Sequence, residues 1–244
     1  MSRGNREQGT GNSRDEPTVP SSLFPVRSVQ AVVFDMDGVL LDSEPLHHEV
    51  LNGVLADEGK SLTFDDYRPY IGTTLEYTWS DIIRRYALRG PLDEYILRYD
   101  EHILDAYRRH SVAVPGARAL LDLLRERGVR RAVASSSRTD WVETALTTMN
   151  IRGAFELIVT GDMVTQSKPD PEIYLLAAQR LALAPTACLA IEDSPKGVAA
   201  AHAAGMTVIG VRTAYTAHLP LDGAAVIVDS LADITPLMMT EHPR

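Results

Sequence analysis

The sequence predicts an α/β protein with a Rossmann-like, three-layer core, a mainly parallel sheet and an inserted α-helical cap domain. Three observations predict this fold. Short apolar runs alternate with amphipathic helical patterns along most of the chain, which is typical of parallel strands joined by crossover helices. The first three runs end abruptly in polar residues, as buried strands do at a sheet edge. One long interval near the start carries helical patterns but no strand, which indicates a folded insertion.

The composition excludes several classes of protein. The chain has 244 residues, of which 45% are hydrophobic and 23% are charged, as in ordinary globular proteins. A net charge of -9 leaves no basic stripe for phosphate backbones, so we expect no nucleic acid partner. Cys188 is the single cysteine, which excludes an internal disulfide and favours a reducing compartment. No apolar run reaches the roughly 20 residues of a membrane helix, and no signal peptide is recognisable, so we expect a cytoplasmic protein without a membrane partner.

The domain organisation follows from shifts in composition. Residues 1–27 are rich in Gly, Ser, Asn, Arg and acidic residues with little to bury, which predicts a disordered tail. Residues 28–44 and 113–244 are predicted to form the core. Residues 45–112, called the insertion below, are predicted to form the helical cap.

Five apolar runs in the predicted core are interpreted as strands: 29–34, 129–134, 187–191, 206–211 and 224–228. Helical patterns lie between them at 117–127, 141–149, 171–181 and 195–204. Gly128 and Gly205 are expected as helix C-caps, and Ser194 as an N-cap.

The insertion carries three amphipathic stretches, at 46–57, 75–86 and 92–107, which predict helices. Trp79 and Tyr86 are expected to form part of its apolar core. Because the insertion leaves the chain just after the first strand, we expect it to cover that end of the sheet.

Polar side chains follow three of the predicted strands, and a lysine precedes a helix. In open α/β sheets, ligands bind beyond the carboxyl ends of the strands, so we expect these side chains to share one cleft. Crowded carboxylates repel one another unless a cation is present, and hard oxygen ligands suit Mg²⁺. With the metal and the lysine supplying positive charge, such a cleft can accept a phosphate dianion. The residues are Asp35, Asp37, Ser135, Lys168, Glu192 and Asp193.

The spacing of the first two aspartates suits phosphoryl transfer. Asp35 and Asp37 are two residues apart, so on an extended chain both side chains point to the same side. One carboxylate can attack phosphorus to give an aspartyl-phosphate, and the other can act as a general acid and then a general base.

These residues resemble the four motifs of the haloacid dehalogenase superfamily: FDMDGV (34–39), the strand-terminal Ser135, Lys168 in SKPDP, and IEDSPKG (191–197). The insertion resembles the cap of the subgroup containing β-phosphoglucomutase and many small-molecule phosphatases. The resemblance implies that Asp35 is the nucleophile and Asp37 the general acid/base. It also implies that Ser135 binds the phosphoryl group and that Lys168 pairs with it and with Asp35.

The same resemblance implies a Mg²⁺ site made by Asp35, the backbone carbonyl of Asp37, and Asp193. The resemblance implies that Glu192 either binds the metal as a further ligand or contacts the residues that bind it. The dehalogenases of the superfamily lack the second aspartate, so Asp37 favours phosphoryl transfer.

The choice between phosphatase and mutase depends on the insertion. In the mutases a Gly-x-Ser-Arg loop holds a second phosphate, and the matching stretch here is Gly72-Thr73-Thr74-Leu75. Leu75 cannot hold a phosphate, so we expect a Mg²⁺-dependent phosphatase, a phosphoric monoester hydrolase, acting on a small phosphorylated metabolite such as a sugar phosphate. The chain is expected to be a monomer or a weak homodimer. His47 and Arg138 resemble mutase residues, so a β-phosphoglucomutase-like mutase is the alternative. The expected substrate-binding residues are Ser136, Gly72, Thr73, Thr74, His47 and Arg138.

Overall fold

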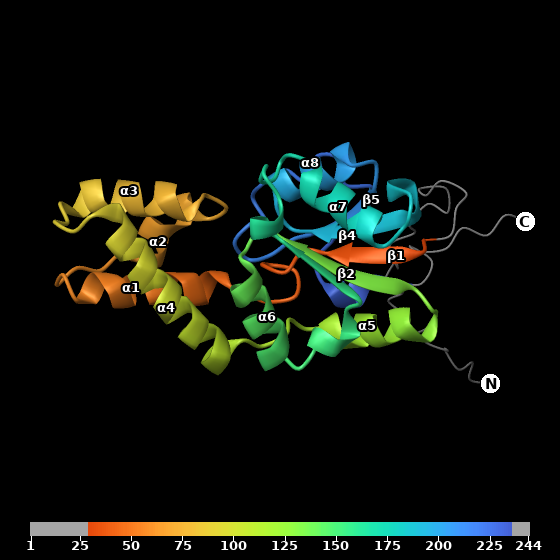
Figure 1. Cartoon of the computed structure of the whole chain (residues 1–244), viewed down its shortest axis with the longest axis horizontal. Coiled ribbons are helices and arrows are strands. Elements are labelled where there is room, and N and C mark those ends of the chain that lie inside the picture. Colours follow the sequence, from red (N-terminus) through yellow and green to blue (C-terminus); the bar gives the residue numbers. More distant parts are fainter. Residues whose placement is uncertain (1–28, 236–244) are drawn as a thin grey trace, which may run out of the picture.

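The computed structural model describes residues 29–235, and the predicted tail of residues 1–27 lies outside them. Six parallel strands form one sheet in the order β3-β2-β1-β4-β5-β6 (Figure 1). The strands are β1 (Ala31–Phe34), β2 (Arg130–Ser135), β3 (Leu157–Thr160), β4 (Cys188–Glu192), β5 (Thr207–Val211) and β6 (Val226–Val228). The strand order reverses direction at β1, which is the kind of switch point where α/β proteins bind ligands.

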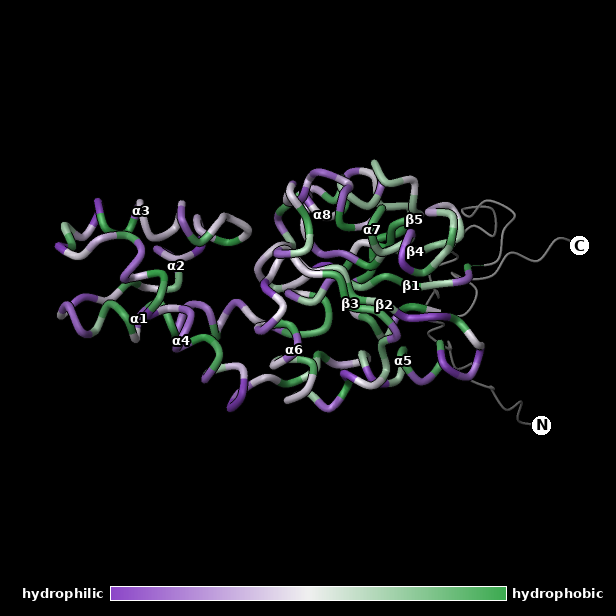
Figure 2. Tube along the Cα trace, viewed as in Figure 1, coloured by the Kyte–Doolittle hydropathy of each residue, from purple (hydrophilic) through white to green (hydrophobic). Residues whose placement is uncertain are grey.

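Helices cover both faces of the sheet. α5 (Ala117–Glu126) and α6 (Thr139–Thr148) pack on one face, where Val32 and Phe34 of β1 are buried. α7 (Glu172–Arg180) and α8 (Pro195–Ala203) pack on the other, against Ala31 and Val33. Alternate β1 residues therefore enter opposite layers of the core, as the two-residue period of a strand requires. Figure 2 shows hydrophobic residues concentrated along the central strands. The predicted three-layer core is confirmed.

The insertion is helical, as predicted. It contains α1 (Glu44–Ala56), the short α2 (Phe64–Tyr67), α3 (Leu75–Tyr86) and α4 (Leu92–His110). Figure 1 shows these helices as a separate group beside the sheet. Trp79 is fully buried and stacks on Tyr95 with ring centroids 5.3 Å apart, as expected for an apolar core inside the insertion. α4 also packs on α6 of the core, where Trp141 meets the rings of Tyr99 and Tyr107.

Two adjacent linkers connect the insertion to the core: residues 35–43, between β1 and α1, and residues 111–116, between α4 and α5 (Ala117–Glu126). The backbone N–H of Val114 donates to the carbonyl of Leu40 at 3.0 Å, and Leu41 forms an antiparallel bridge with Ala113. The outgoing and returning chains therefore run side by side.

The sequence missed two elements. β3 was not predicted because Leu157–Thr160 offers only three consecutive apolar residues, at an edge of the sheet. α2 is a single turn capped by Thr63, too short to show a helical period. The predicted caps are confirmed: Gly128 and Gly205 have positive φ values of 67° and 86° after helices, and the Ser194 hydroxyl accepts from the backbone N–H of Gly197.

Candidate active site

The carboxyl edge of the sheet brings the predicted polar residues together. Asp35 follows β1, Ser135 ends β2, and Glu192 ends β4. β1 lies between β2 and β4, with Phe34 in register with both Val133 and Ile191. The three strands therefore deliver their terminal side chains to neighbouring positions. All three of these side chains are buried.

Lys168 joins two of the buried carboxylates. Its Nζ atom donates to Asp35 Oδ1 at 2.6 Å, to Glu192 Oε1 at 2.6 Å and to the backbone carbonyl of Ala134 at 3.0 Å. The lysine side chain is only 7% exposed, so these contacts form in a region of low dielectric where charge pairing is strong. Asp35 and Glu192 in turn hold the pKa of Lys168 well above its usual value, although burial opposes the charge. Lys168 therefore remains an ammonium ion at neutral pH.

Glu192 is enclosed on every side by protein groups. Besides Lys168, its Oε1 atom accepts from the hydroxyl of Tyr174 at 2.6 Å. Its Oε2 atom accepts from the backbone N–H of Asp193 at 3.1 Å and from the Ser194 hydroxyl at 3.2 Å. Gly197 packs directly against the carboxylate and leaves no room for a side chain. Both oxygens of Glu192 are thus engaged, which fixes its position behind Asp35 and Asp193.

Asp37 lies on the opposite side of the site. Its Oδ2 atom accepts from the hydroxyl of Ser137 at 2.8 Å and from that of Ser135 at 3.4 Å. Its Oδ1 atom lies 3.9 Å from His47 Nε2 and is buried without a hydrogen-bond partner among residues 29–235. Asp37 thus keeps one oxygen available for a further proton or ligand.

His47 connects Asp37 to the insertion. It lies on α1, its Nδ1 atom is 2.5 Å from the hydroxyl of Tyr99, and its Nε2 atom is 3.2 Å from the hydroxyl of Tyr107. Burial opposes the charge of His47, but Asp37 and Glu44 raise its pKa above the usual value. The insertion therefore supplies an imidazole beside Asp37, and the surrounding carboxylates favour its protonated form.

The two catalytic-motif aspartates differ in their acidity. Burial raises the pKa of Asp35 to about 8, against the attraction of Lys168. Burial also opposes ionisation of Asp37, but His47 and Ser137 together hold its pKa below the usual value. The pKa values of two carboxyl groups in one site are thus shifted in opposite directions, which is typical of active sites.

The acidic residues fit a magnesium ion. One oxygen each from Asp35, Glu192 and Asp193 lies within 4.8 Å of the others, and all three residues are buried. Burial raises the pKa of Asp193 well above its usual value, and the neighbouring Glu192 and Asp35 add to this shift, so a divalent cation would relieve the repulsion. Because Glu192 already accepts several protein donors, Asp35 and Asp193 are the better placed to hold the metal.

Gly38 is required where the chain passes Asp193. It has a φ of +76°, and a Cβ atom on it would lie 2.2 Å from Asp193 Oδ2. Glycine is needed here both for the left-handed backbone conformation and for the close approach of the backbone to the carboxylate.

The remaining predicted residues lie around this cluster. The Ser136 side chain is exposed, and Ser137, two residues after the end of β2, is the neighbour that contacts Asp37. Arg138 pairs with Asp100 of α4 and with Asp140, and none of its contacts is with the buried carboxylates.

The loop of the insertion that was predicted to bind substrate, residues 72–75, makes one hydrogen bond to the core among the described residues. The carbonyl of Gly72 accepts from Lys196 Nζ of α8 at 3.0 Å. Thr73 donates to the carbonyl of Tyr70, and Thr74 caps α3. Tyr174, Gly197 and Lys196 were not identified from the sequence, because no local pattern shows which carboxylate or carbonyl they meet.

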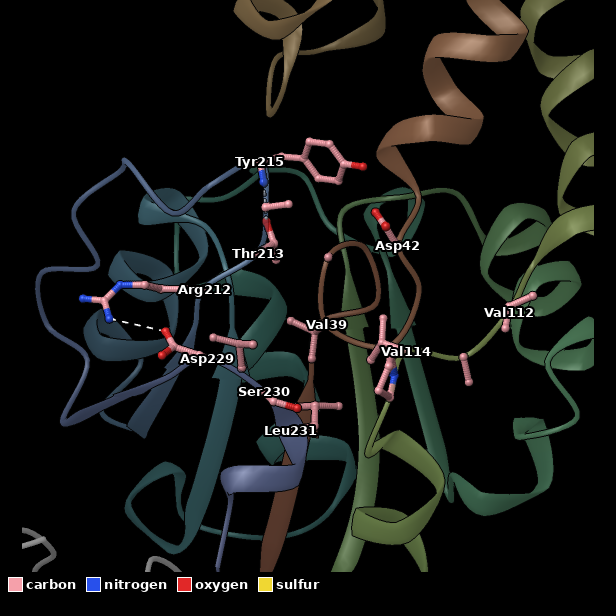
Figure 3. A pocket seen from close by; sticks show the side chains of 15 residues that line it. Val39, Asp42, Val112, Val114, Arg212, Thr213, Tyr215, Asp229, Ser230 and Leu231 are labelled. Carbon is pink, nitrogen blue, oxygen red and sulfur yellow. Dashed lines mark hydrogen bonds and ion pairs between the residues drawn. The ribbon is translucent and has the colours of Figure 1, made fainter. Parts of the chain in front are cut away.

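A cavity of about 400 Å³ lies next to this site but is separate from its chemistry (Figure 3). It is lined by both linkers, by the segment after β5 and by residues 229–231. Figure 3 shows Asp42 and Tyr215 at one end and the Arg212–Asp229 ion pair at the other. None of the residues predicted to bind substrate or metal lines it. Catalysis is therefore assigned to the carboxylate cluster and not to this cavity.

A parallel sheet with a lysine and buried carboxylates at its carboxyl edge has the arrangement of an α/β enzyme's active site. The sequence profile of the haloacid dehalogenase-like hydrolases matches residues 32–211. The chain belongs to this family.

Named relatives agree with the predicted enzyme class, a phosphoric monoester hydrolase. The phosphorylated carbohydrates phosphatase of Thermotoga maritima is 32% identical over 199 residues, covering 82% of this chain and 90% of the relative. Hexitol phosphatase B of Escherichia coli is 31% identical over 187 residues, covering 76% and 84%. The crystal structure of CbbY from Rhodobacter sphaeroides in complex with phosphate superposes with a TM-score of 0.75 at 29% identity, covering 84% of this chain and 96% of that one.

Among the helices of residues 29–235, none has the length and apolar character needed to cross a membrane.

Proposed function

We propose that this protein is a Mg²⁺-dependent phosphatase that hydrolyses a small phosphorylated sugar or similar metabolite through an aspartyl-phosphate on Asp35. The observation that carries the proposal is the buried contact between Lys168 and one oxygen of Asp35, within a cluster of carboxylates suited to a cation. This arrangement orients a carboxylate nucleophile and supplies the positive charge that a phosphate dianion needs.

In the first step, Asp35 attacks phosphorus. The new Asp35–phosphorus bond forms as the ester bond to the leaving oxygen breaks, and Asp37 donates a proton to that oxygen. Lys168 compensates negative charge on the transferred phosphoryl group, and the Ser135 hydroxyl donates to it. Mg²⁺, held by Asp35 and Asp193, would neutralise charge on the phosphate as the bond changes.

In the second step, Asp37 takes a proton from water, whose oxygen attacks phosphorus. The Asp35–phosphorus bond breaks, inorganic phosphate leaves, and the carboxylate of Asp35 is restored. The low pKa of Asp37 suits this role as a base. For the first step, the negative charge of a bound phosphate beside Asp37 would raise its pKa and favour the protonated form.

The insertion supports the proposal as a cap over the site. Its α1 helix places His47 beside Asp37, and its Gly72 loop meets α8 of the core. We propose that residues 45–112 close over the bound substrate and exclude water while the aspartyl-phosphate forms.

The proposed substrate class rests on the relatives and on Leu75. One relative is named for phosphorylated carbohydrates and another for hexitols, and CbbY has been crystallised with xylulose-1,5-bisphosphate. Leu75 begins α3 and packs against the apolar core of the insertion. A mutase would need a phosphate-binding side chain at this position to hold a second phosphate, so Leu75 supports hydrolysis.

The test is phosphate release from a panel of phosphorylated sugars, with Mg²⁺ and with a chelator. We expect metal-dependent release, its loss in Asp37→Asn, and a milder loss in Ser135→Ala. The same assay follows β-glucose 1-phosphate with a coupled readout for glucose 6-phosphate. Isomerisation with little phosphate release would show a mutase, and activity that is unchanged by the chelator would contradict the proposed metal.

A further inference from the structure

Lys196 is a cation at the junction between the core and the insertion. It lies in the first turn of α8, three residues after Asp193, and its side chain is exposed. Its Nζ atom donates to the carbonyl of Gly72 at 3.0 Å. It forms no ion pair with any carboxylate between residues 29 and 235.

Lys168, Arg138 and the imidazole of His47 already face carboxylates. Lys168 binds Asp35 and Glu192, and His47 faces Asp37. Arg138 binds Asp100 and Asp140. Among these four side chains, Lys196 is the one held by a neutral carbonyl. An anion can replace this carbonyl, because an ion pair adds Coulomb attraction to the hydrogen bond.

The loop opposite Lys196 offers few other polar groups. The Thr73 hydroxyl donates to the carbonyl of Tyr70 at 2.7 Å and lies 2.8 Å from the hydroxyl of Thr78. The Thr74 hydroxyl accepts from the backbone N–H of Tyr77 at the start of α3. Both hydroxyls therefore already have partners within the insertion, and Lys196 is the positively charged donor at this contact between α8 and the loop.

We propose that Lys196 is a specificity-determining residue that binds an anionic group, a carboxylate or second phosphate, on the leaving part of the substrate. This inference rests on the proposed phosphatase function. A phosphate on Asp35 would direct its leaving group away from the sheet and toward the junction where Lys196 of α8 meets the Gly72 loop of the insertion. On binding, the ammonium group would exchange the Gly72 carbonyl for the substrate anion.

The experiment compares substrates that differ only in a distal anionic group. The pairs are sorbitol 6-phosphate with 6-phosphogluconate, and glycerol 3-phosphate with 3-phosphoglycerate; in each pair a hydroxymethyl group is replaced by a carboxylate. kcat and KM are measured for the wild type, Lys196→Met and Lys196→Arg. Lys60→Met is the matched control, because Lys60 is also exposed but lies within the insertion after α1.

We expect Lys196→Met to lower kcat/KM for the anionic member of each pair by about tenfold, mainly through KM, as for loss of one charge-assisted hydrogen bond. The neutral member should change by less than about twofold, because it makes no such bond. Lys196→Arg should restore most of the preference, and added salt should weaken it in the wild type.

Equal losses on both members of a pair would overturn the inference, because they would show that Lys196 only ties the insertion to the core. An unchanged ratio in Lys196→Met would overturn it as well. Failure of the wild type to release phosphate from any substrate would overturn the proposed function itself, and the inference with it.

Discussion

Replacing Gly197 by alanine would place a methyl group in the space that the Glu192 carboxylate occupies. A Cβ atom at this position would lie 1.9 Å from Oε1 and 2.1 Å from Oε2. Glu192 is fully buried and bound to Lys168, Tyr174 and Ser194, so it cannot move aside without breaking hydrogen bonds.

The expected change in the free energy of unfolding has the opposite sign to that of a glycine-to-alanine change at an ordinary helical position. Changing glycine to alanine inside a helix usually stabilises a protein by about 0.5–1 kcal/mol. Overpacking costs about 1–3 kcal/mol, and a lost hydrogen bond to a charged group costs about 1.5–3 kcal/mol. We therefore expect Gly197→Ala to lower the free energy of unfolding by about 2–5 kcal/mol and to abolish phosphate release.

Gly53→Ala is the matched control. Gly53 lies in α1, and a Cβ atom there would meet nothing within 4 Å, so this variant should gain about 0.5–1 kcal/mol and keep its activity. The assay is urea denaturation of both variants together with phosphate release. If Gly197→Ala were as stable and active as Gly53→Ala, the described enclosure of Glu192 would be wrong.

Three further predictions concern stability, acidity and reactivity. Trp79→Ala should lower the free energy of unfolding by about 3–5 kcal/mol in urea, because it empties the apolar core of the insertion. Hydrogen bonds from Thr160 and Thr139 lower the pKa of Asp162 in the folded protein below the usual 3.8. The Asp162 carboxylate therefore stabilises the folded protein above the usual pKa, and this stabilisation is lost as the pH falls through the pKa of the folded state. The stability gap between wild type and Asp162→Asn should thus be larger at about pH 6 than at about pH 3, and an equal gap would contradict the assignment. Burial raises the pKa of the Cys188 thiol to about 11, so Ellman's reagent at about pH 8 should react only after unfolding, and rapid labelling of the folded protein would disprove its burial.

The fold was largely predictable because its signals are local. Apolar runs marked five of the six strands, and each predicted strand begins or ends within two residues of its observed bounds. β3 was missed because a four-residue edge strand carries too little pattern to separate it from a loop. The insertion was recognised because sixty-odd residues of helical pattern cannot be a loop between strands.

The site was predictable only where motifs follow strand ends. Asp35, Lys168 and Glu192 meet as expected, because parallel strands deliver their carboxyl ends to one edge. The contacts of Tyr174 with Glu192 and of Lys196 with Gly72 could not be predicted. They join residues that are distant in the sequence, and they depend on how α7, α8 and the insertion pack.

The central claim is that Asp35 carries the phosphoryl group during turnover. The most direct measurement is borohydride reduction of the enzyme while it hydrolyses a substrate, followed by mass spectrometry of the peptide that contains residue 35. An acyl phosphate on Asp35 is reduced to the alcohol of homoserine, whereas a free carboxylate is not. We predict homoserine at position 35 only when substrate and Mg²⁺ are present, and none in Lys168→Met if that variant no longer turns over. Unmodified Asp35 in an enzyme that is turning over, or reduction at another carboxylate, would contradict this account.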